Sequence, residues 1–265
     1  MFKLIFLFIL LFTLSFVLYL ILDIFYYLIK FRDQRIVTEK VVFQQSSWFY
    51  KIFVLFPKAY AYEILSRDPN DFKDTGLILF EGEQGAGKTM AMTQYCNTLK
   101  AKYPDLIICS NYGLLIEDFN LDSWEPIVGD LNGSSGLVAC FDEISLWFSN
   151  RNYANFPSDF LRCIVQNRKE HRLILGTCQQ INMVDKQIRR QCTEVRKCRT
   201  FFGCVTVVWK FRPVFSGDGE IIRLVSKGMY FFIQERVLRY QYDTFRVVEN
   251  LKKVGFIDNE KNRSC

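Results

Sequence analysis

The pattern of apolar and polar positions begins with a long uninterrupted apolar run. Residues 4–22 carry no charge, and Asp23 is the first interruption. As a helix, this run would be roughly 28 Å long, close to the roughly 30 Å hydrocarbon thickness of a bilayer. The pattern therefore predicts a membrane-spanning helix within residues 1–29.

A cleaved signal peptide is the alternative interpretation of this run. The run is longer than the usual signal core, and no Ala-x-Ala cleavage site follows it. Only Lys3 precedes the run, whereas four basic residues follow it: Lys30, Arg32, Arg35 and Lys40. These features favour an uncleaved anchor, and the positive-inside rule then predicts that residues 30–265 lie in the cytoplasm.

Residues 30–74 are predicted to form a juxtamembrane linker. Within them, residues 48–56 make a second apolar, aromatic run that contains Lys51 and is too short to span a membrane. This run predicts either an interfacial segment or a buried strand. The polar residues 67–71 then lead into the main domain.

Residues 75–200 alternate short apolar runs with polar and helix-compatible segments. The apolar runs at 77–80, 137–141 and 172–179 predict strands, and residues 90–102 predict a helix. Short strands that are apolar throughout are typical of a parallel sheet buried on both faces. This range is therefore predicted to be an α/β core with a mostly parallel central sheet.

The pattern becomes β-rich toward the C-terminus. Residues 200–211 and 221–233 predict two strands with a turn at 216–219 between them, and residues 242–248 predict a further strand. Residues 201–256 are therefore expected to extend the sheet with antiparallel strands. Residues 257–265 form a polar tail.

Composition narrows the chemistry. The chain has one histidine, His171, which nearly excludes Ser-His-Asp triads and multi-histidine metal sites. Nine cysteines are an odd number, so reduced thiols are expected rather than a disulfide framework. Cys192, Cys198 and Cys204 have no recognised metal-ligand spacing. The formal net charge of +6 fits contact with phosphate or an anionic membrane but requires neither.

A glycine-rich segment follows the first predicted strand. It reads Gly82-Glu83-Gln84-Gly85-Ala86-Gly87-Lys88-Thr89 and matches G-x-x-x-x-G-K-[ST] between a strand and a helix. The glycines let backbone N–H groups curl around a phosphate. Lys88 would reach the β- and γ-phosphates, and the Thr89 hydroxyl would bind Mg²⁺. The motif predicts a site for ATP and Mg²⁺.

Two acids follow the second predicted strand. At the carboxyl end of a buried parallel strand, Asp142 would hold Mg²⁺ through water. Glu143 would act as general base on an attacking water, which indicates hydrolysis rather than binding alone. Taken by itself, the strand could also end in a plain exposed acidic turn.

The third predicted strand also ends in polar residues. Thr177 and Gln179 are candidates for sensing the γ-phosphate or the attacking water, with Gln180 as an alternative register. Gln179 is assigned to the catalytic set. The alternative is a polar pair that simply faces a loop.

The order of these motifs resembles the Zot-like ATPases, named after the zonular occludens toxin domain, a branch of the FtsK–HerA superfamily. The most specific part of the match is Arg168-Lys169, Thr177-x-Gln179 and Val184-Asp185-Lys186-Gln187-Ile188-Arg189. The resemblance covers roughly residues 75–200. It implies a RecA-like P-loop NTPase fold and an ATP-driven motor that moves phage or viral DNA during assembly, packaging or export.

The resemblance also implies a homo-oligomeric ring, expected to be hexameric, with ATP bound between subunits. Phage or viral structural proteins are possible partners, and the anchor would lie in a host or virion membrane. An arginine from the neighbouring subunit would stabilise charge on the transferring phosphoryl group. Arg189 is the first candidate for this role, and Arg168 and Arg151 are the others.

Basic residues are concentrated next to this stretch. Between Lys186 and Arg212 there are eight lysines and arginines but a single acid, Glu194. Such a stripe would track the phosphates of single- or double-stranded DNA without sequence preference.

One feature departs from the family pattern. Filamentous-phage assembly proteins place the P-loop before the membrane segment, whereas here the apolar run comes first. A packaging ATPase and a plasmid or chromosome DNA-transfer ATPase both remain open. The other alternative is a membrane nucleotide switch or assembly scaffold that does not bind DNA.

Overall fold

The computed structural model describes residues 2–32, 47–66, 71–122, 127, 136–147, 163–217 and 219–242. The chain divides into two compact units, Met1–Pro69 and Asn70–Cys265. Arg151 lies outside the described residues, as does the predicted strand at 242–248 apart from Tyr242.

The first unit is helical. Helix α1 (Phe2–Phe31) covers the predicted membrane segment. Its stretch from Ile5 to Phe31 is long and apolar enough to cross a membrane, with a mean hydropathy of 2.9.

The aromatic run at 48–56 is also helical, so the strand interpretation is wrong. Three elements follow one another here: α2 (Trp48–Tyr50), the π-helix η1 (Lys51–Leu55) and α3 (Phe56–Leu65). Aromatic side chains four residues apart, such as Phe49 and Phe53, lie close together on this helical segment. Phe53 also contacts Phe16 of α1 edge-on, with ring centroids 5.4 Å apart. Packing at helical spacing therefore determines the structure of this run.

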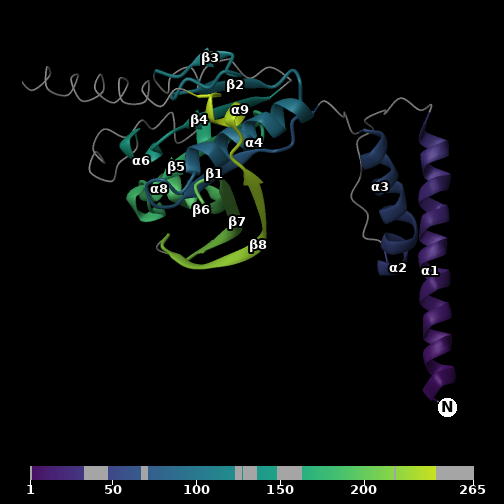
Figure 1. The fold of residues 1–265 in the computed structure, drawn as a ribbon. Helices are drawn as coiled ribbons and strands as arrows, with labels where there is room; N and C mark the ends of the chain where they lie inside the picture. Colours follow the sequence, from purple (N-terminus) through teal and green to yellow (C-terminus); the bar gives the residue numbers. More distant parts are fainter. Residues whose placement is uncertain are drawn as a thin grey trace, which may run out of the picture. The chain divides into compact units, whose positions relative to one another are not determined.

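The second unit is built on one sheet with the strand order β3-β2-β4-β5-β1-β6-β7-β8 (Figure 1). The strands are β1 (Gly76–Glu81), β2 (Ile107–Ser110), β3 (Phe119–Asn120), β4 (Leu137–Phe141), β5 (Arg172–Cys178), β6 (Cys192–Phe201), β7 (Val205–Phe215) and β8 (Ile221–Ile233). Strands β1 to β6 pair in parallel, and β7 and β8 pair antiparallel. The expected parallel core with a C-terminal antiparallel extension is confirmed.

Helices connect these strands and cover the sheet. They are α4 (Lys88–Lys102), α6 (Ile144–Trp147), the 3-10 helix η3 (Ile181–Met183), α8 (Lys186–Arg190) and α9 (Arg236–Arg239). Alternate side chains of the central strands belong to two separate cores. Leu77 and Leu79 of β1 belong to the core that includes Ile188 of α8, whereas Ile78 and Phe80 belong to the core of α4. Burial on both faces is the reason why these strands are apolar throughout.

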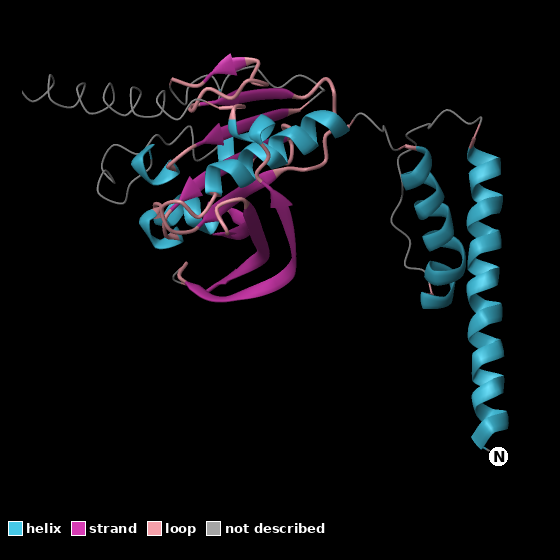
Figure 2. Ribbon diagram, in the orientation of Figure 1, coloured by secondary structure: helices cyan, strands magenta, loops and turns pink. Residues whose placement is uncertain are grey.

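The predicted strand at 200–211 is in fact the two arms of a hairpin. β6 ends at Phe201 and β7 begins at Val205, and the chain reverses at Phe202 and Gly203, whose φ angles are 52° and 68°. Figure 2 shows the long β7 and β8 arrows that continue the sheet from here. The sequence pattern did not indicate this turn, because one glycine is its only turn residue and its neighbours are apolar. One of these apolar neighbours, Phe202, is 94% exposed.

Candidate nucleotide site

The glycine-rich segment forms the loop between β1 and α4. Gly85 and Gly87 have φ angles of 78° and 82°, in the left-handed region that favours glycine. Lys88 is the first residue of α4, and its Nζ donates to the carbonyl oxygens of Gly82 and Glu83, each at 3.0 Å. The loop therefore closes over the N-terminus of a helix, where backbone N–H groups and the helix dipole favour a phosphate.

Asp142 meets hydroxyl groups from two other elements. Its Oδ1 accepts hydrogen bonds from Thr89 Oγ1 at 2.9 Å and from Thr177 Oγ1 at 2.7 Å. Because β5 lies between β1 and β4, the carboxyl ends of three strands meet at this point. Mg²⁺ in nucleotide sites prefers oxygen ligands, takes one or two from the protein and the rest from phosphates and water. The oxygens of Thr89 and Asp142 fit this requirement.

Glu143 follows directly and has a strained backbone. Its φ of 54° lies in the left-handed region, which is uncommon for a non-glycine residue. Its N–H donates to Thr177 Oγ1 at 2.8 Å, and its Oε1 accepts from Ser145 Oγ at 3.0 Å. One threonine hydroxyl thus positions both acids.

Asn111 is a site residue that the sequence analysis missed. It follows β2, is almost fully buried, and contacts both the carbonyl and the N–H of Asp142. Its Nδ2 donates to the Asp142 carbonyl at 3.1 Å, and its Oδ1 accepts from the Asp142 N–H at 2.7 Å. The one available signal was a polar residue at the end of a short apolar strand.

Replacing Thr177 with Val is expected to lower the free energy of unfolding by about 1–3 kcal/mol, because it removes the donor to a carboxylate and the acceptor of the Glu143 N–H. Urea unfolding followed by tryptophan fluorescence measures this change. Thr177→Ser keeps the hydroxyl and should lose only the buried methyl group, about 0.8 kcal/mol. Thr98→Val removes an exposed hydroxyl on α4 as a second control. Equal stability of Thr177→Val and wild type would contradict the positioning role.

Gln179 and Gln180 lie elsewhere at the same edge of the sheet. Both are exposed and line a cavity of about 630 Å³ whose wall includes residues 82–84 of the glycine-rich loop. Among the contacts of the described residues, none joins Gln179 to Asp142 or Glu143. The structure therefore places Thr177 beside Asp142, and the catalytic role of Gln179 stays a prediction.

Arg189 is buried in the second unit, where it is 4% exposed. Its guanidinium donates to Asn182 Oδ1 at 3.1 Å and forms an ion pair with Glu220 at 3.1 Å. These partners within the chain would have to be released before Arg189 could reach a neighbouring subunit. Arg168 is exposed in the turn before β5.

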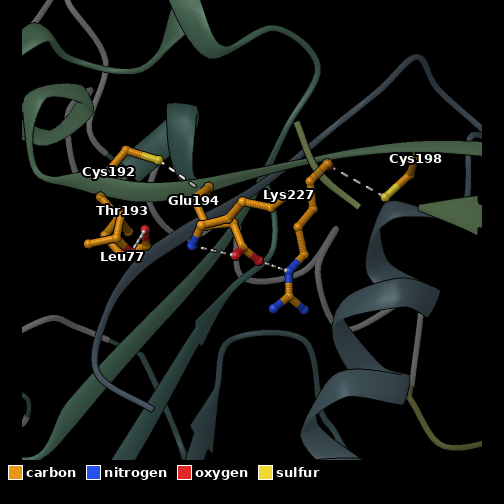
Figure 3. A network of polar contacts seen from close by, with 7 residues as sticks. Leu77, Cys192, Thr193, Glu194, Cys198 and Lys227 are labelled. Atoms are coloured by element: carbon orange, nitrogen blue, oxygen red, sulfur yellow. Dashed lines mark hydrogen bonds and ion pairs between the residues drawn. The ribbon is translucent and has the colours of Figure 1, made fainter. Parts of the chain in front are cut away.

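The basic stripe between Lys186 and Arg212 is only partly exposed. Arg196 is 3% exposed, donates to Glu194 at 2.7 Å and lies 3.8 Å from the ring centroid of Tyr95. Lys227 forms an ion pair with the same Glu194 at 3.5 Å (Figure 3). Arg189 and Arg196 are therefore both buried and paired within the chain. The exposed cations of the stripe are Lys186, Arg190, Lys197, Arg199 and Arg212.

Side chains of β6, of β7 and of the residue that follows β8 hold the glycine-rich loop 82–89, called the phosphate loop here. Thr200 Oγ1 donates to the carbonyl oxygen of Ala86 at 3.0 Å and lies 3.0 Å from Thr206 Oγ1. Gln234 Nε2 donates to Thr206 at 2.7 Å. The loop is thus tied to β6, β7 and the end of β8, which no motif in the sequence indicated.

No protein-family model matches the sequence, and no curated protein matches it either. Among solved structures, the fold is similar to the N-terminal domain of zonular occludens toxin from Neisseria meningitidis, with 13% identity, a TM-score of 0.43 and coverage of 63% of this chain and 98% of that one. It is also similar to B204, the DNA-packaging ATPase from Sulfolobus turreted icosahedral virus, with 11% identity, a TM-score of 0.39 and coverage of 48% and 76%.

A third similar structure is the flagellar accessory protein FlaH from Methanocaldococcus jannaschii, with 14% identity, a TM-score of 0.37 and coverage of 64% of this chain and 97% of that one. One of these similar structures, the zonular occludens toxin domain, is of the type that the sequence motifs resemble. Identities at this level concern the fold alone.

Proposed function

We propose that this chain is a membrane-anchored ATPase whose hydrolysis of ATP moves phage or viral DNA during virion assembly, packaging or export. The observation that carries the ATPase part is the meeting of Thr89, Asp142 and Thr177 through one carboxylate oxygen, with Glu143 beside it. A phosphate loop, oxygen ligands for Mg²⁺ and a candidate base thus share one edge of the sheet.

Each side chain at this edge has a separate task. The loop N–H groups and Lys88 would bind the β- and γ-phosphates, and Thr89 and Asp142 would hold Mg²⁺. When bound, Mg²⁺ neutralises charge on the phosphate oxygens. Glu143 would take a proton from the attacking water, and Thr177 would hold both acids in place.

The motor part of the proposal rests on α1, the exposed cations and the motif resemblance. Helix α1 would anchor the chain with its second unit in the cytoplasm, and the exposed cations of the basic stripe would bind DNA phosphates. In a homo-oligomeric ring, expected to be a hexamer, ATP would lie between subunits. Arg168 is a better candidate than the buried Arg189 for an arginine that acts on the neighbour's ATP.

ATP turnover by the full chain in lipid nanodiscs, with and without single- or double-stranded DNA, tests this proposal. We expect turnover that depends on Mg²⁺, rises with DNA and is lost in Lys88→Ala. Lys102→Ala is the matched control, because Lys102 lies at the other end of α4 and pairs with Asp74 at 2.9 Å.

The outcomes separate the two parts of the proposal. Turnover that neither DNA changes would rule out a DNA motor and favour the nucleotide switch or scaffold. Turnover that survives Lys88→Ala would show that the phosphate loop is not the site of hydrolysis.

A further inference from the structure

The phosphate loop borders a cavity of about 430 Å³ whose opposite wall comes from the chain after β8. The loop and the start of α4 line one side with Gly85, Gly87, Lys88, Thr89 and Met90. The other side is lined by Gln234, Arg239 and Tyr242, which belong to none of the nucleotide-binding motifs. A triphosphate bound by the loop would occupy the first side, so its nucleoside has room to extend toward the second.

The segment that carries these three residues is attached at both ends. At its start, the Gln234 N–H donates to the Cys204 carbonyl at 2.7 Å, and Arg239 donates to the carbonyl oxygen of Gly203. At its end, the Gln241 carbonyl accepts from the Leu115 N–H at 2.8 Å. Figure 1 shows α9 beside α4. The wall of the cavity is therefore held in place by the β6–β7 turn and by the chain after β2.

Tyr242 is half-buried against the core on the α4 side of the sheet. Its ring meets that of Tyr112 edge-on, with centroids 5.8 Å apart. Burial raises the pKa of the Tyr242 hydroxyl, the charge of Asp142 raises this pKa further, and the charge of Arg239 lowers it. Tyr242 and Arg239 line the same cavity.

An aromatic ring and a guanidinium on one cavity wall suit a planar, electron-rich ligand. Nucleobases stack on tyrosine rings and on arginine planes, and such contacts tolerate different bases because every base has a π-face. Among the described residues that line this cavity, none carries a carboxylate. Its chemistry therefore matches a nucleoside attached to a phosphate chain.

We propose that Tyr242 and Arg239 form the base-binding side of the nucleotide site and contact the nucleobase of the bound triphosphate. The inference rests on the proposed function, because the phosphates must first be held by the loop. It assigns nucleotide affinity in part to the C-terminal segment of the same chain, outside the parallel core.

Calorimetric titration of the full chain in detergent, with Mg²⁺ and either ATP or inorganic tripolyphosphate, tests the assignment. Tyr242→Ala should weaken ATP binding by about 5- to 150-fold, the range for losing one stacked base. Binding of tripolyphosphate should stay unchanged, because this ligand has no base. Tyr242→Phe keeps the ring and should bind both ligands as wild type does.

Two neighbouring residues provide matched controls. Tyr240 is 79% exposed and does not line the cavity, so Tyr240→Ala should bind ATP as wild type does. Arg236 is exposed one helical turn before Tyr240, so Arg236→Ala is the control for Arg239→Ala. We expect Arg239→Ala to weaken ATP and spare tripolyphosphate.

The failures can be told apart. If Tyr242→Ala and Tyr240→Ala bind ATP equally, the base-binding assignment is wrong while the phosphate site stands. If either Tyr242→Ala or Arg239→Ala weakens tripolyphosphate as much as ATP, that residue supports the phosphate loop and its assignment to the base is overturned. If wild type binds neither ligand, the proposed function itself fails, and this inference fails with it.

Discussion

Replacing Glu143 with Gln is expected to lower ATP turnover by about 10²–10⁴-fold, the usual contribution of a positioned general base. The amide cannot accept the proton of the attacking water at neutral pH, yet it keeps nearly the same shape. Asp142, Thr89 and the loop keep their contacts, so ATP affinity should stay close to that of wild type. Turnover and calorimetric affinity, measured on one preparation, separate the two effects.

Glu235→Gln is the matched control for this change. Glu235 is exposed at the start of α9, and its side chain makes no capping hydrogen bond. It should leave turnover unchanged. If Glu143→Gln hydrolyses ATP as fast as this control, another group accepts the proton and Glu143 is not the base.

Replacing Gly87 with Ala is expected to abolish ATP binding and to lower the free energy of unfolding by about 2–5 kcal/mol. Part of this loss comes from the φ of 82°, which disfavours any side chain. The rest comes from contact, because the new Cβ would lie 2.6 Å from Thr200 Oγ1 and 2.9 Å from Thr206 Oγ1. The threonines that support the loop would have to move, and the loop with them.

Gly85→Ala separates the two contributions. Gly85 has a similar φ of 78°, but a Cβ there would meet nothing within 4 Å. It should therefore lose only the backbone part, about 1–2 kcal/mol. Urea unfolding without nucleotide compares the two variants directly. Equal losses in both would show that the contact with Thr200 and Thr206 does not hold the loop.

Local chemistry is what the sequence predicted well. The phosphate loop is one run of consecutive residues, and its glycines, lysine and threonine act through backbone conformation and short reach. The strand that ends just before Asp142 and the strand that contains Thr177 could be predicted, because burial on both faces demands continuous apolar residues. Parallel strands also bring their carboxyl ends to one edge, so the meeting of these elements followed from the pattern.

The sequence pattern could not predict which polar side chains face one another at that edge. Thr177 and Gln179 are two residues apart, so the sequence could not tell which of them faces Asp142. The pairing of β4 with β5 places Thr177 against Asp142. The aromatic run at 48–56 shows the same limit, because its apolar residues fit a strand or a helix equally well in sequence and the structure makes it helical. The ion pair of Arg189 likewise joins it to Glu220, which is 31 positions away in the chain.

The amino-acid sequence by itself thus determined the apolar N-terminal helix, the parallel core and the motif that would bind phosphate, since each is written in neighbouring or regularly spaced residues. Tertiary structure alone decided which groups support and complete the site: Asn111 on the Asp142 backbone, Thr200 under Ala86, and Tyr242 on the far wall of the cavity. These contacts join segments far apart in the chain, and the physical reason is that hydrogen bonds and packing depend on distance in space, which residue spacing does not encode.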